Sequence, residues 1–335
     1  MIKVGVNGYG VIGKRVADAV MLQDDMELVG IAKRDADYKA IVAAKHGISI
    51  FNSGDEKGFR GSSIEVAGTL DDMLSQVDVV VDCTPEGIGA SNKQLYDKHG
   101  IKAIWEGGEE HELTGLSFNA YANYDKAVGA ERVRVVSCNT TGLIRTLYPL
   151  QQAFGIESVN AVLVRRAADP PETKKGPINA LEPDAGIPSH HGPDVKTVMS
   201  GLNIETVAIK APTTIMHLHY VDAVLRRQAS ADEILAVWKK YRRIKLFSFN
   251  DDVKSTAQIQ DFARDMGRNR GDLYEIAVWQ EIRVDGRHLR YFQAVHQESD
   301  VVPENIDAIR ALSGTEPNGQ KSIDKTDKSM GIGTL

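Results

Sequence analysis

Residues 2–13 have the sequence Ile2-Lys3-Val4-Gly5-Val6-Asn7-Gly8-Tyr9-Gly10-Val11-Ile12-Gly13. The β-branched residues at its start predict a buried strand, and the G-x-G-x-x-G pattern that follows predicts a tight turn into a helix. In such a turn Gly8 bends the chain, Gly10 lets the backbone approach a pyrophosphate, and Gly13 packs the helix closely against the strand. Amides at the helix start, including those of Val11 and Ile12, then face the phosphates. The alternative is a glycine turn that binds no ligand.

Short apolar runs alternate with amphipathic stretches through the rest of residues 1–137. The runs that predict strands are 2–6, 27–32, 77–83, 102–106 and 133–136. Residues 77–83 are almost continuously apolar, which is typical of a central parallel strand covered on both faces. Repeated strand–helix–strand units predict a Rossmann-type domain with a parallel sheet, and we assign residues 1–137 to it.

The second half of the chain has a different pattern. Longer strand-like stretches at 159–165, 213–224 and 275–284 predict an α+β catalytic domain, residues 138–302, with a mixed or antiparallel sheet. Pro303 suits the first turn of a helix, and we expect a C-terminal helix of about 303–335 to return to the first domain. The last twenty residues, rich in Gly, Ser and Lys, are expected to be loosely specified.

Composition excludes several classes of protein. The chain has 335 residues, and 40 Lys and Arg against 46 Asp and Glu give a net charge of −6, so no global field attracts nucleic acid. Two cysteines cannot form a disulfide framework. The N-terminal segment lacks the features of a signal peptide, and no apolar run is long enough to span a membrane. We therefore expect a cytoplasmic protein with no nucleic-acid or membrane partner.

The end of the second predicted strand indicates which dinucleotide is bound. A carboxylate at this position hydrogen-bonds the ribose 2′-hydroxyl of NAD, but here the position holds Lys33 and Arg34. Two cations attract a 2′-phosphate, so NADP is favoured, although NAD can also bind. Asp35 follows directly, and the alternative is a solvated basic loop with Asp35 on the ribose.

Cys138 is a candidate nucleophile because it lies between a predicted strand and a predicted helix. Amides at a helix N-terminus stabilise a thiolate, which is the reactive form of the side chain. Asn139, Thr140 and Thr141 are residue types that cap such a junction. The alternative is a buried structural cysteine, which is the interpretation that we give Cys83.

Four histidines are candidates for an acid or base that acts with a thiol: His190, His191, His217 and His219. Strand alternation puts His217 and His219 on one face, with Met216, Leu218 and Tyr220 on the other. Periodicity does not separate His217 from His219. A pair of histidines at i and i+2 can also ligate zinc, but no carboxylate or second thiol accompanies them at motif spacing, so no metal is predicted.

Several motifs spread along nearly the whole chain resemble those of one enzyme family. They are Val6-Asn7-Gly8-Tyr9-Gly10, Asp82-Cys83-Thr84-Pro85-Glu86-Gly87, Ser137-Cys138-Asn139-Thr140-Thr141-Gly142-Leu143, Ser189-His190-His191-Gly192-Pro193-Asp194-Val195-Lys196-Thr197 and His296-Gln297-Glu298-Ser299-Asp300. Together they resemble the archaeal type of phosphorylating glyceraldehyde-3-phosphate dehydrogenase. The bacterial and eukaryotic branch instead has Thr-Thr-Asn after its cysteine.

This resemblance implies a reaction and a set of site residues. It implies oxidation of D-glyceraldehyde 3-phosphate to 1,3-bisphosphoglycerate with NAD(P) and inorganic phosphate, through a thioester on Cys138, in a homotetramer. It assigns His217 as catalytic acid and base. The residues that it places at the substrate or the phosphates are Ser137, Asn139, Arg165, Arg166, His190 and His191. Those that it adds at the cofactor are Gly107, Gly108, Arg166 and Gln297.

The arginines have a physical reason to serve this chemistry. Two anions must meet in one site of an acidic chain, and guanidinium groups suit bidentate phosphate binding. Lys174 and Lys175 on the following loop are either part of this site or an exposed basic edge. Two rival functions are another thiol-dependent semialdehyde dehydrogenase and a non-catalytic dinucleotide-binding sensor.

Overall fold

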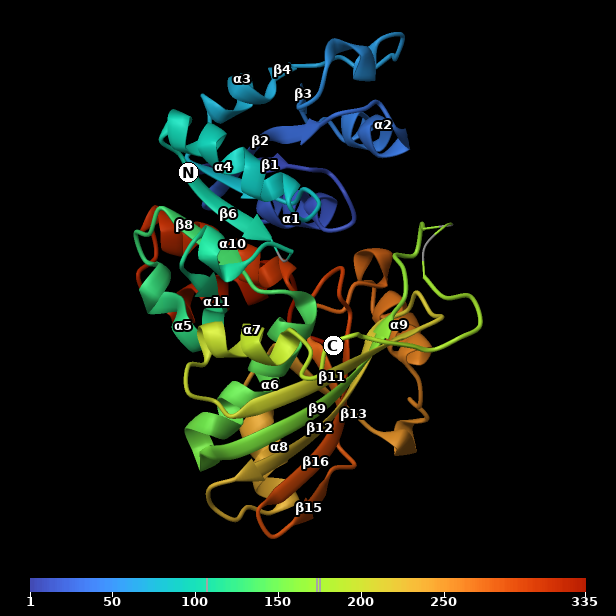
Figure 1. The fold of residues 1–335 in the computed structure, drawn as a ribbon. Helices are drawn as coiled ribbons and strands as arrows, with labels where there is room; N and C mark the ends of the chain where they lie inside the picture. The colour runs from blue at the N-terminus through green and yellow to red at the C-terminus, as the bar shows by residue number, and fades with distance from the viewer. Residues whose placement is uncertain (107, 173, 175) are drawn as a thin grey trace. The chain divides into compact units, whose positions relative to one another are not determined.

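The computed structural model describes residues 1–106, 108–172, 174 and 176–335, and Figure 1 shows their fold. They form two compact units. Unit 1 comprises Met1–Ser137 and Val302–Met330, and unit 2 comprises Cys138–Val301 and Gly331–Leu335. Each unit contains its own sheet with helices, so the predicted α/β class is confirmed.

The sheet of unit 1 is parallel at every pairing of its eight strands, in the order β4-β3-β2-β1-β5-β6-β8-β7. The strands are β1 (Ile2–Asn7), β2 (Met26–Lys33), β3 (Ile50–Asn52), β4 (Gly68–Thr69), β5 (Val79–Asp82), β6 (Lys102–Glu106), β7 (Ser117–Phe118) and β8 (Arg132–Val135). The five predicted strands are confirmed to within two residues at each end. β3, β4 and β7 were not predicted, because two or three residues carry no readable periodicity.

β5 has the central place that its composition predicts. It pairs with β1 on one side and β6 on the other, and all four of its residues are buried. The carboxyl ends of β1, β2, β5 and β6 lie along one edge of the sheet, since the strands are parallel. This edge is where ligands bind in open α/β sheets.

The helices of unit 1 are α1 (Gly13–Met21), α2 (Tyr38–Lys45), α3 (Leu70–Leu74), α4 (Ile88–His99), α5 (Ala120–Ala127), α10 (Val302–Ser313) and α11 (Gly319–Ser329). α10 is buried over residues 302–312. Its Arg310 donates to both oxygens of Asp25 (2.7 and 2.8 Å) and to Gln23 (2.7 Å) and Thr326 (2.7 Å). These bonds fasten α10 to the turn after α1 and to α11.

The C-terminal segment differs from the prediction in two ways. It forms two helices instead of one, because the chain turns at Gly314, where φ is 70°. The last twenty residues are not loosely specified, since most of them form α11. Asn318 caps that helix by accepting from the amide of Lys321 (3.0 Å), and Ser322 and Thr326 both donate to buried Asp307 (2.7 Å each). Tertiary hydrogen bonds therefore compensate for a weak local preference for helix.

The sheet of unit 2 is mixed, as predicted. Its main path runs β10-β11-β9-β12-β16-β14-β13, and β15 pairs with β16. The strands are β9 (Ile156–Arg166), β10 (Glu182–Pro183), β11 (Ile204–Ala211), β12 (His217–Leu225), β13 (Ile244–Phe247), β14 (Ile276–Trp279), β15 (Arg283–Asp285) and β16 (His288–Val295). The pairs β9/β11 and β13/β14 are parallel, and the other pairs are antiparallel.

Two predicted strands of unit 2 have different bounds in the structure. The stretch 213–224 joins the sheet only at His217, because Met216 has a φ of 58°, which a strand does not accommodate. The stretch 275–284 divides into β14 and β15. Between them the carboxylate of Glu281 accepts from Ser248 Oγ (2.5 Å) and from the amide of Phe249 (3.0 Å), so the backbone leaves the ladder there.

The helices of unit 2 are α6 (Cys138–Phe154), α7 (His191–Val198), α8 (Ala231–Trp238) and α9 (Thr256–Asp265). α6 approaches β16 closely at Gly142, where an added Cβ would lie 2.6 Å from a methyl carbon of Val295. α9 packs on the other side of β14 and β16, in a cluster that includes Met216, Leu218 and Ile259. Among the described residues, no helix combines the length and the apolar character that crossing a membrane requires.

Candidate active site

The glycine loop of unit 1 has the geometry that the sequence pattern predicts. Gly8 has a φ of 95°, and an added Cβ would lie 2.8 Å from the carbonyl carbon and oxygen of Cys83. At Gly13 a Cβ would lie 1.9 Å from the oxygen of Gly8, whereas at Gly10 it would meet no atom of the described structure within 4 Å. Within the described residues no side chain caps α1 at Ile12, so amides at the helix start remain for a phosphate.

Gly13→Ala is expected to disrupt the loop and weaken dinucleotide binding. A methyl group 1.9 Å from a carbonyl oxygen forces the loop away from the helix, and such overpacking costs about 1–3 kcal/mol. The midpoint of urea unfolding and the Kd for NADP, from fluorescence quenching, measure the two effects. Gly10→Ala is the matched control, because it adds a methyl in open space and should weaken binding without lowering stability. Unchanged NADP affinity in Gly13→Ala would contradict this assignment.

Asp82 organises the turn that follows β5, next to the glycine loop. Its buried carboxylate accepts from the amide and hydroxyl of Thr84 (2.9 and 2.5 Å), from Asn92 (2.8 Å) and from the hydroxyl of Tyr96 (2.6 Å). Burial, together with the charges of Glu106 and Asp82, raises the pKa of Cys83 in the same turn. A thiol that stays protonated fits the structural role given to Cys83.

The two basic residues at the end of β2 differ in their surroundings: Lys33 contacts a carboxylate, and Arg34 is exposed. Lys33 Nζ lies 3.1 Å from Asp37 Oδ2 and is mostly buried, and Asp37 also caps α2. Arg34 and Asp35 are exposed. Gly58 packs closely against the backbone of this loop, since an added Cβ at Gly58 would lie 1.9 Å from the carbonyl oxygen of Arg34. The structure therefore presents the guanidinium of Arg34 to solvent from a fixed backbone.

At the carboxyl end of β6, Glu106 is buried, and burial raises its pKa to about 8. It is therefore largely uncharged at pH 7 and does not repel a bound anion. Gly108, predicted to contact the cofactor, donates its amide to the oxygen of Glu106 (3.0 Å). Gly107, its predicted companion, lies outside the described residues.

In unit 2, α6 begins at Cys138, as the sequence predicts. Cys138 and Ser137 are partly exposed, and neither cysteine of the chain forms a disulfide. The next residues are buried and anchored: Thr140 Oγ1 donates to Asp194 Oδ2 (2.6 Å), and Asn139 contacts two histidines. A partly exposed cysteine at the start of a 17-residue helix is placed where the helix dipole stabilises its thiolate.

His217 and His219 share one buried face of β12, as alternation predicts, but their ring nitrogens are used differently. His219 Nε2 lies 2.9 Å from Asn139 Oδ1 and its Nδ1 lies 3.1 Å from Gln293 Nε2, so both nitrogens are engaged. His217 Nδ1 accepts from the amide of Arg166 (2.9 Å), which leaves the proton of the neutral ring on Nε2. This geometry favours His217 over His219 as the group that meets a substrate.

Burial sets the charge of these rings. It lowers the pKa of His219 to about 3, with a further contribution from Arg165. It lowers the pKa of His217 well below its ordinary value, with contributions from His219, Arg166, Arg165 and His191. Both rings are therefore neutral at pH 7.

His190 and His191 stack on one another, with ring centroids 3.9 Å apart. His191 is buried, and its nitrogens lie 3.4 Å from Asn139 Nδ2 and 3.1 Å from Ser189 Oγ. Burial, followed by the charges of His190 and Arg165 and the ring of His219, lowers the pKa of His191 to about 2. His190 is exposed, so it is the member of the pair that solvent reaches.

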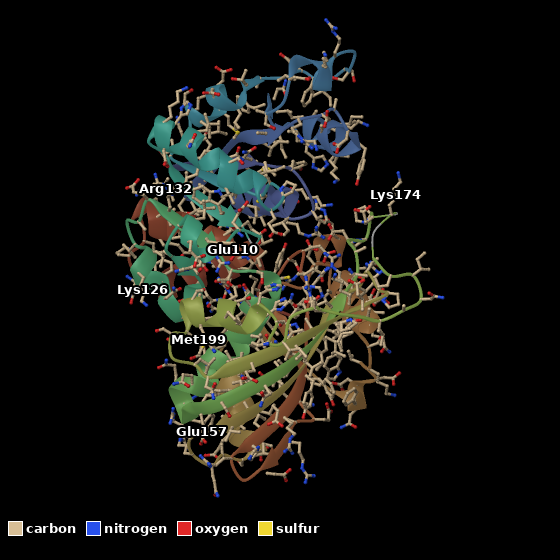
Figure 2. All side chains as sticks on the ribbon, in the orientation of Figure 1. Glu110, Lys126, Arg132, Glu157, Lys174 and Met199 are labelled. Carbon is tan, nitrogen blue, oxygen red and sulfur yellow. The ribbon has the colours of Figure 1, made fainter. Side chains whose placement is uncertain are left out.

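The two predicted phosphate-binding arginines already contact carboxylates. Arg165 Nη1 lies 3.2 Å from Asp184, and its buried Nε has no hydrogen-bond partner among the described residues. Arg166 is mostly buried and contacts Glu298 (3.1 Å) and Asp169 (2.5 Å). Lys174 is exposed on the segment between β9 and β10, as Figure 2 shows, and Lys175 lies outside the described residues.

Asp184, His190 and His191 bring possible metal-ligand atoms within 4.8 Å of one another. Asp184 already contacts Arg165, and both nitrogens of His191 contact protein groups. A metal ion would have to displace these partners, so the arrangement does not favour a metal centre.

Gln297 has the property expected of a residue that meets a polar ligand. It is 4% exposed, and neither polar atom of its side chain has a hydrogen-bond partner among the described residues. A buried polar group without a partner costs about 1–3 kcal/mol. Its neighbours are held in place, since His296 contacts Glu298 (3.0 Å) and accepts from the amide of Leu273 (3.0 Å). This unsatisfied amide and the glycine loop both fit a nicotinamide dinucleotide.

Three residues of the buried cluster were not predicted. Gln293 lies directly opposite His219 in the β12/β16 ladder. Thr146 donates to Gln293, and Tyr291 donates to Thr146. Thr146 lies three residues after the motif that ends at Leu143, and Gln293 lies three residues before the motif that begins at His296. Only the packing of α6 against β16 shows that they belong to one cluster. An inward-facing glutamine in an apolar strand is the one signal that could have indicated Gln293.

Comparison with known proteins agrees with these features. The model of the family described as glyceraldehyde 3-phosphate dehydrogenase, C-terminal domain, matches residues 137–282, and that of dihydrodipicolinate reductase, N-terminus, matches residues 2–107. The glyceraldehyde-3-phosphate dehydrogenase of Thermoplasma volcanium is 55% identical over 334 residues, which cover 99% of this chain and 98% of the relative. The chain belongs to the glyceraldehyde-3-phosphate dehydrogenase family.

Further relatives support the same assignment. The glyceraldehyde-3-phosphate dehydrogenase of Methanothermobacter thermautotrophicus is 54% identical over 336 residues, covering 99% of this chain and all of the relative. That of Picrophilus torridus is 52% identical over 335 residues, covering 99% and 97%. The family resemblance drawn from the motifs is thus confirmed. Membership of this family implies a nicotinamide dinucleotide cofactor.

Proposed function

We propose that this chain catalyses the phosphorylating oxidation of D-glyceraldehyde 3-phosphate to 1,3-bisphosphoglycerate. The observation that carries the proposal is Cys138, partly exposed as the first residue of α6, in a member of the glyceraldehyde-3-phosphate dehydrogenase family. Helix amides stabilise the thiolate there, and a thiolate is the nucleophile that an aldehyde requires.

The reaction proceeds through covalent chemistry at Cys138. The thiolate adds to the aldehyde carbon, and the carbonyl oxygen becomes the oxyanion of a hemithioacetal. The nicotinamide ring, when bound, would serve as the hydride acceptor. The carbon that has lost hydride forms a thioester with Sγ. Inorganic phosphate then attacks the thioester carbonyl, releasing the acyl phosphate and returning the thiolate.

His217 is proposed as the catalytic partner of Cys138. Because the amide of Arg166 occupies Nδ1, the neutral ring carries its proton on Nε2, from which it donates a hydrogen bond to the oxyanion. An oxyanion expels hydride without losing a proton. The function as a base, which the family resemblance implies, is therefore not needed in that step.

The same cluster is proposed to bind the two anions. Arg165, whose Nε has no hydrogen-bond partner among the described residues, and exposed His190 are best placed to contact phosphate groups. Ser137 precedes the nucleophile in the chain. Arg166, His191 and Asn139 already have partners, so they support the site through positive charge or position. Gln297 and the glycine loop are proposed to hold the cofactor.

NADP is proposed as the preferred cofactor, with Arg34 as the group that selects it. Arg34→Ala is expected to raise the KM for NADP roughly tenfold, because one charge-assisted hydrogen bond to the 2′-phosphate is lost. The KM for NAD should change little, since NAD lacks that phosphate. Initial rates with each cofactor give both values. An equal effect on the two cofactors would contradict a contact with the 2′-phosphate.

The proposed function is tested by following reduced cofactor at 340 nm with glyceraldehyde 3-phosphate and phosphate. We expect formation of NADPH that depends on both compounds. Activity with a non-phosphorylated semialdehyde alone would instead support a different thiol-dependent dehydrogenase. Stoichiometric NADP binding without any aldehyde-dependent hydride transfer would overturn the proposal in favour of a sensor.

A homotetramer in the cytoplasm is the assembly and location that we propose from the family resemblance. The half-exposed ring of Phe292 on β16, beside Tyr220, offers apolar surface for contact between copies. Sedimentation equilibrium measures the oligomeric state.

A further inference from the structure

A buried row of hydrogen bonds runs through unit 2 toward the residue that follows the nucleophile. At one end Tyr291 Oη donates to Thr146 Oγ1 (2.9 Å), and Thr146 Oγ1 donates to Gln293 Oε1 (2.7 Å). With its oxygen bound to Thr146, the Gln293 amide turns its nitrogen toward His219 Nδ1 (3.1 Å). An amide nitrogen only donates, so His219 Nδ1 must accept and the ring proton lies on Nε2.

The row continues from His219 to the start of α6. Nε2–H of His219 donates to Asn139 Oδ1 (2.9 Å), which turns the Asn139 nitrogen toward His191 Nε2 (3.4 Å). His191 is then protonated at Nδ1 and donates to Ser189 Oγ (3.1 Å). Each contact in the row joins a donor to an acceptor. The orientation of Asn139 is therefore set by groups on β12 and β16 as well as by its own helix.

His219 has no ring nitrogen left for a substrate or a proton in transit. Its ring is completely buried, and burial lowers its pKa to about 3. The charged and titratable groups that influence one another in this ring cluster are Arg165, Arg166, His190, His191, His217 and His219. A neutral, doubly hydrogen-bonded ring at this place holds its neighbours in position.

We propose that His219 is a positioning residue that, through Asn139, fixes the first turn of α6 and so the direction of the Cys138 thiolate. Gln293 and Thr146 set the tautomer of His219 that this requires. The inference rests on the proposed function for its effect on turnover, but the geometry and the thiol reactivity can be measured without it. A misplacement of the nucleophile by about 1 Å can cost 100-fold in rate.

The matched pair Thr146→Val and Thr146→Ser tests the proposal. Valine has the shape of threonine but cannot donate to Gln293, so the amide can reverse and force a proton onto His219 Nδ1. Serine keeps the hydroxyl. We expect kcat and the rate of Cys138 alkylation by iodoacetamide to fall roughly 10- to 100-fold together in Thr146→Val, and to recover in Thr146→Ser. The KM for glyceraldehyde 3-phosphate and the Kd for NADP should stay within about twofold.

Gln293→Glu changes the same contact by charge. A carboxylate cannot donate to His219 Nδ1, so the neutral ring must move its proton from Nε2 to Nδ1 and lose its bond to Asn139. We expect the same joint fall in kcat and alkylation rate. Peptide mass spectrometry separates the alkylation of Cys138 from that of Cys83.

Nitrogen NMR of histidine in the unmodified protein gives a test that needs no variant. We expect a neutral His219 with its proton on Nε2 from pH 5 to 8. A proton on Nδ1, titration within this range, or a tautomer change in Thr146→Val without slower Cys138 alkylation would overturn the proposal. Loss of structure in Thr146→Ser as well would assign the row to folding alone. The proposed function fails separately, if no hydride transfer occurs while alkylation and NMR behave as expected.

Discussion

Cys138→Ser is expected to reduce turnover by a factor on the order of 10⁴ or more, the largest effect of any single substitution considered for this protein. A serine hydroxyl remains protonated at neutral pH, and no neighbouring ring is set to take its proton. His219 is engaged at both nitrogens, and His217 carries its proton on Nε2. A spectrophotometric assay with saturating glyceraldehyde 3-phosphate, phosphate and NADP measures the loss.

Cofactor binding should survive this substitution. The substitution replaces one sulfur atom by oxygen and changes none of the residues proposed to hold the cofactor, so the Kd for NADP should stay close to that of the unmodified protein. Cys83→Ser is the matched control. Its thiol has a raised pKa because of burial, so its loss should leave turnover within about an order of magnitude. Full activity of Cys138→Ser would remove the assignment of the nucleophile.

Mild acid is expected to destabilise the protein strongly. Burial lowers the pKa of His191 to about 2 and that of His219 to about 3, from an ordinary value of 6.5. Below pH 6.5 these histidines bind protons in the unfolded chain but not in the folded one. Their full contribution to stability is therefore present above pH 6.5 and is lost as the pH falls toward 3. At pH 5 each ring lowers the free energy of unfolding by about 2 kcal/mol. This is a large share of the 5–15 kcal/mol that is typical of a folded protein. His217 contributes in the same direction.

Urea unfolding at pH 7 and pH 5 measures this loss. His219→Gln removes one of these rings, because glutamine does not titrate. The difference in unfolding free energy between the two pH values should be about 2 kcal/mol smaller in the variant than in the parent. An unchanged difference would mean that the ring of His219 takes up its proton in the folded state.

Several predictions from sequence were accurate because the physics behind them is short-range. The glycine loop depends on backbone angles and contacts between neighbouring residues, and Gly8 and Gly13 meet the atoms that such a loop requires. Strand alternation depends on adjacent peptide units, and His217 and His219 face the same way. The start of α6 at Cys138 follows from the change in local pattern.

Predictions failed where partners far along the chain stabilise a segment. Residues 319–329 have little intrinsic preference for helix, yet α11 forms because Asp307 accepts bonds from Ser322 and Thr326. The strand predicted from residue 213 begins at His217, since Met216 turns into the cluster beneath α9. The strands β3, β4 and β7 were likewise missed, because a segment of two or three residues does not indicate that it pairs with a neighbouring strand.

The amino-acid sequence was enough to identify the enzyme family, the cofactor class and the residue types of the site. Each of these is indicated by motifs of a few consecutive residues. Strand periodicity could not assign different tasks to His217 and His219, and only the family resemblance pointed to His217. That distinction comes from Arg166, Asn139 and Gln293, which hydrogen-bond to their ring nitrogens. Hydrogen-bond partners fix a tautomer and burial fixes a charge, and both depend on which strands and helices come together in the folded chain.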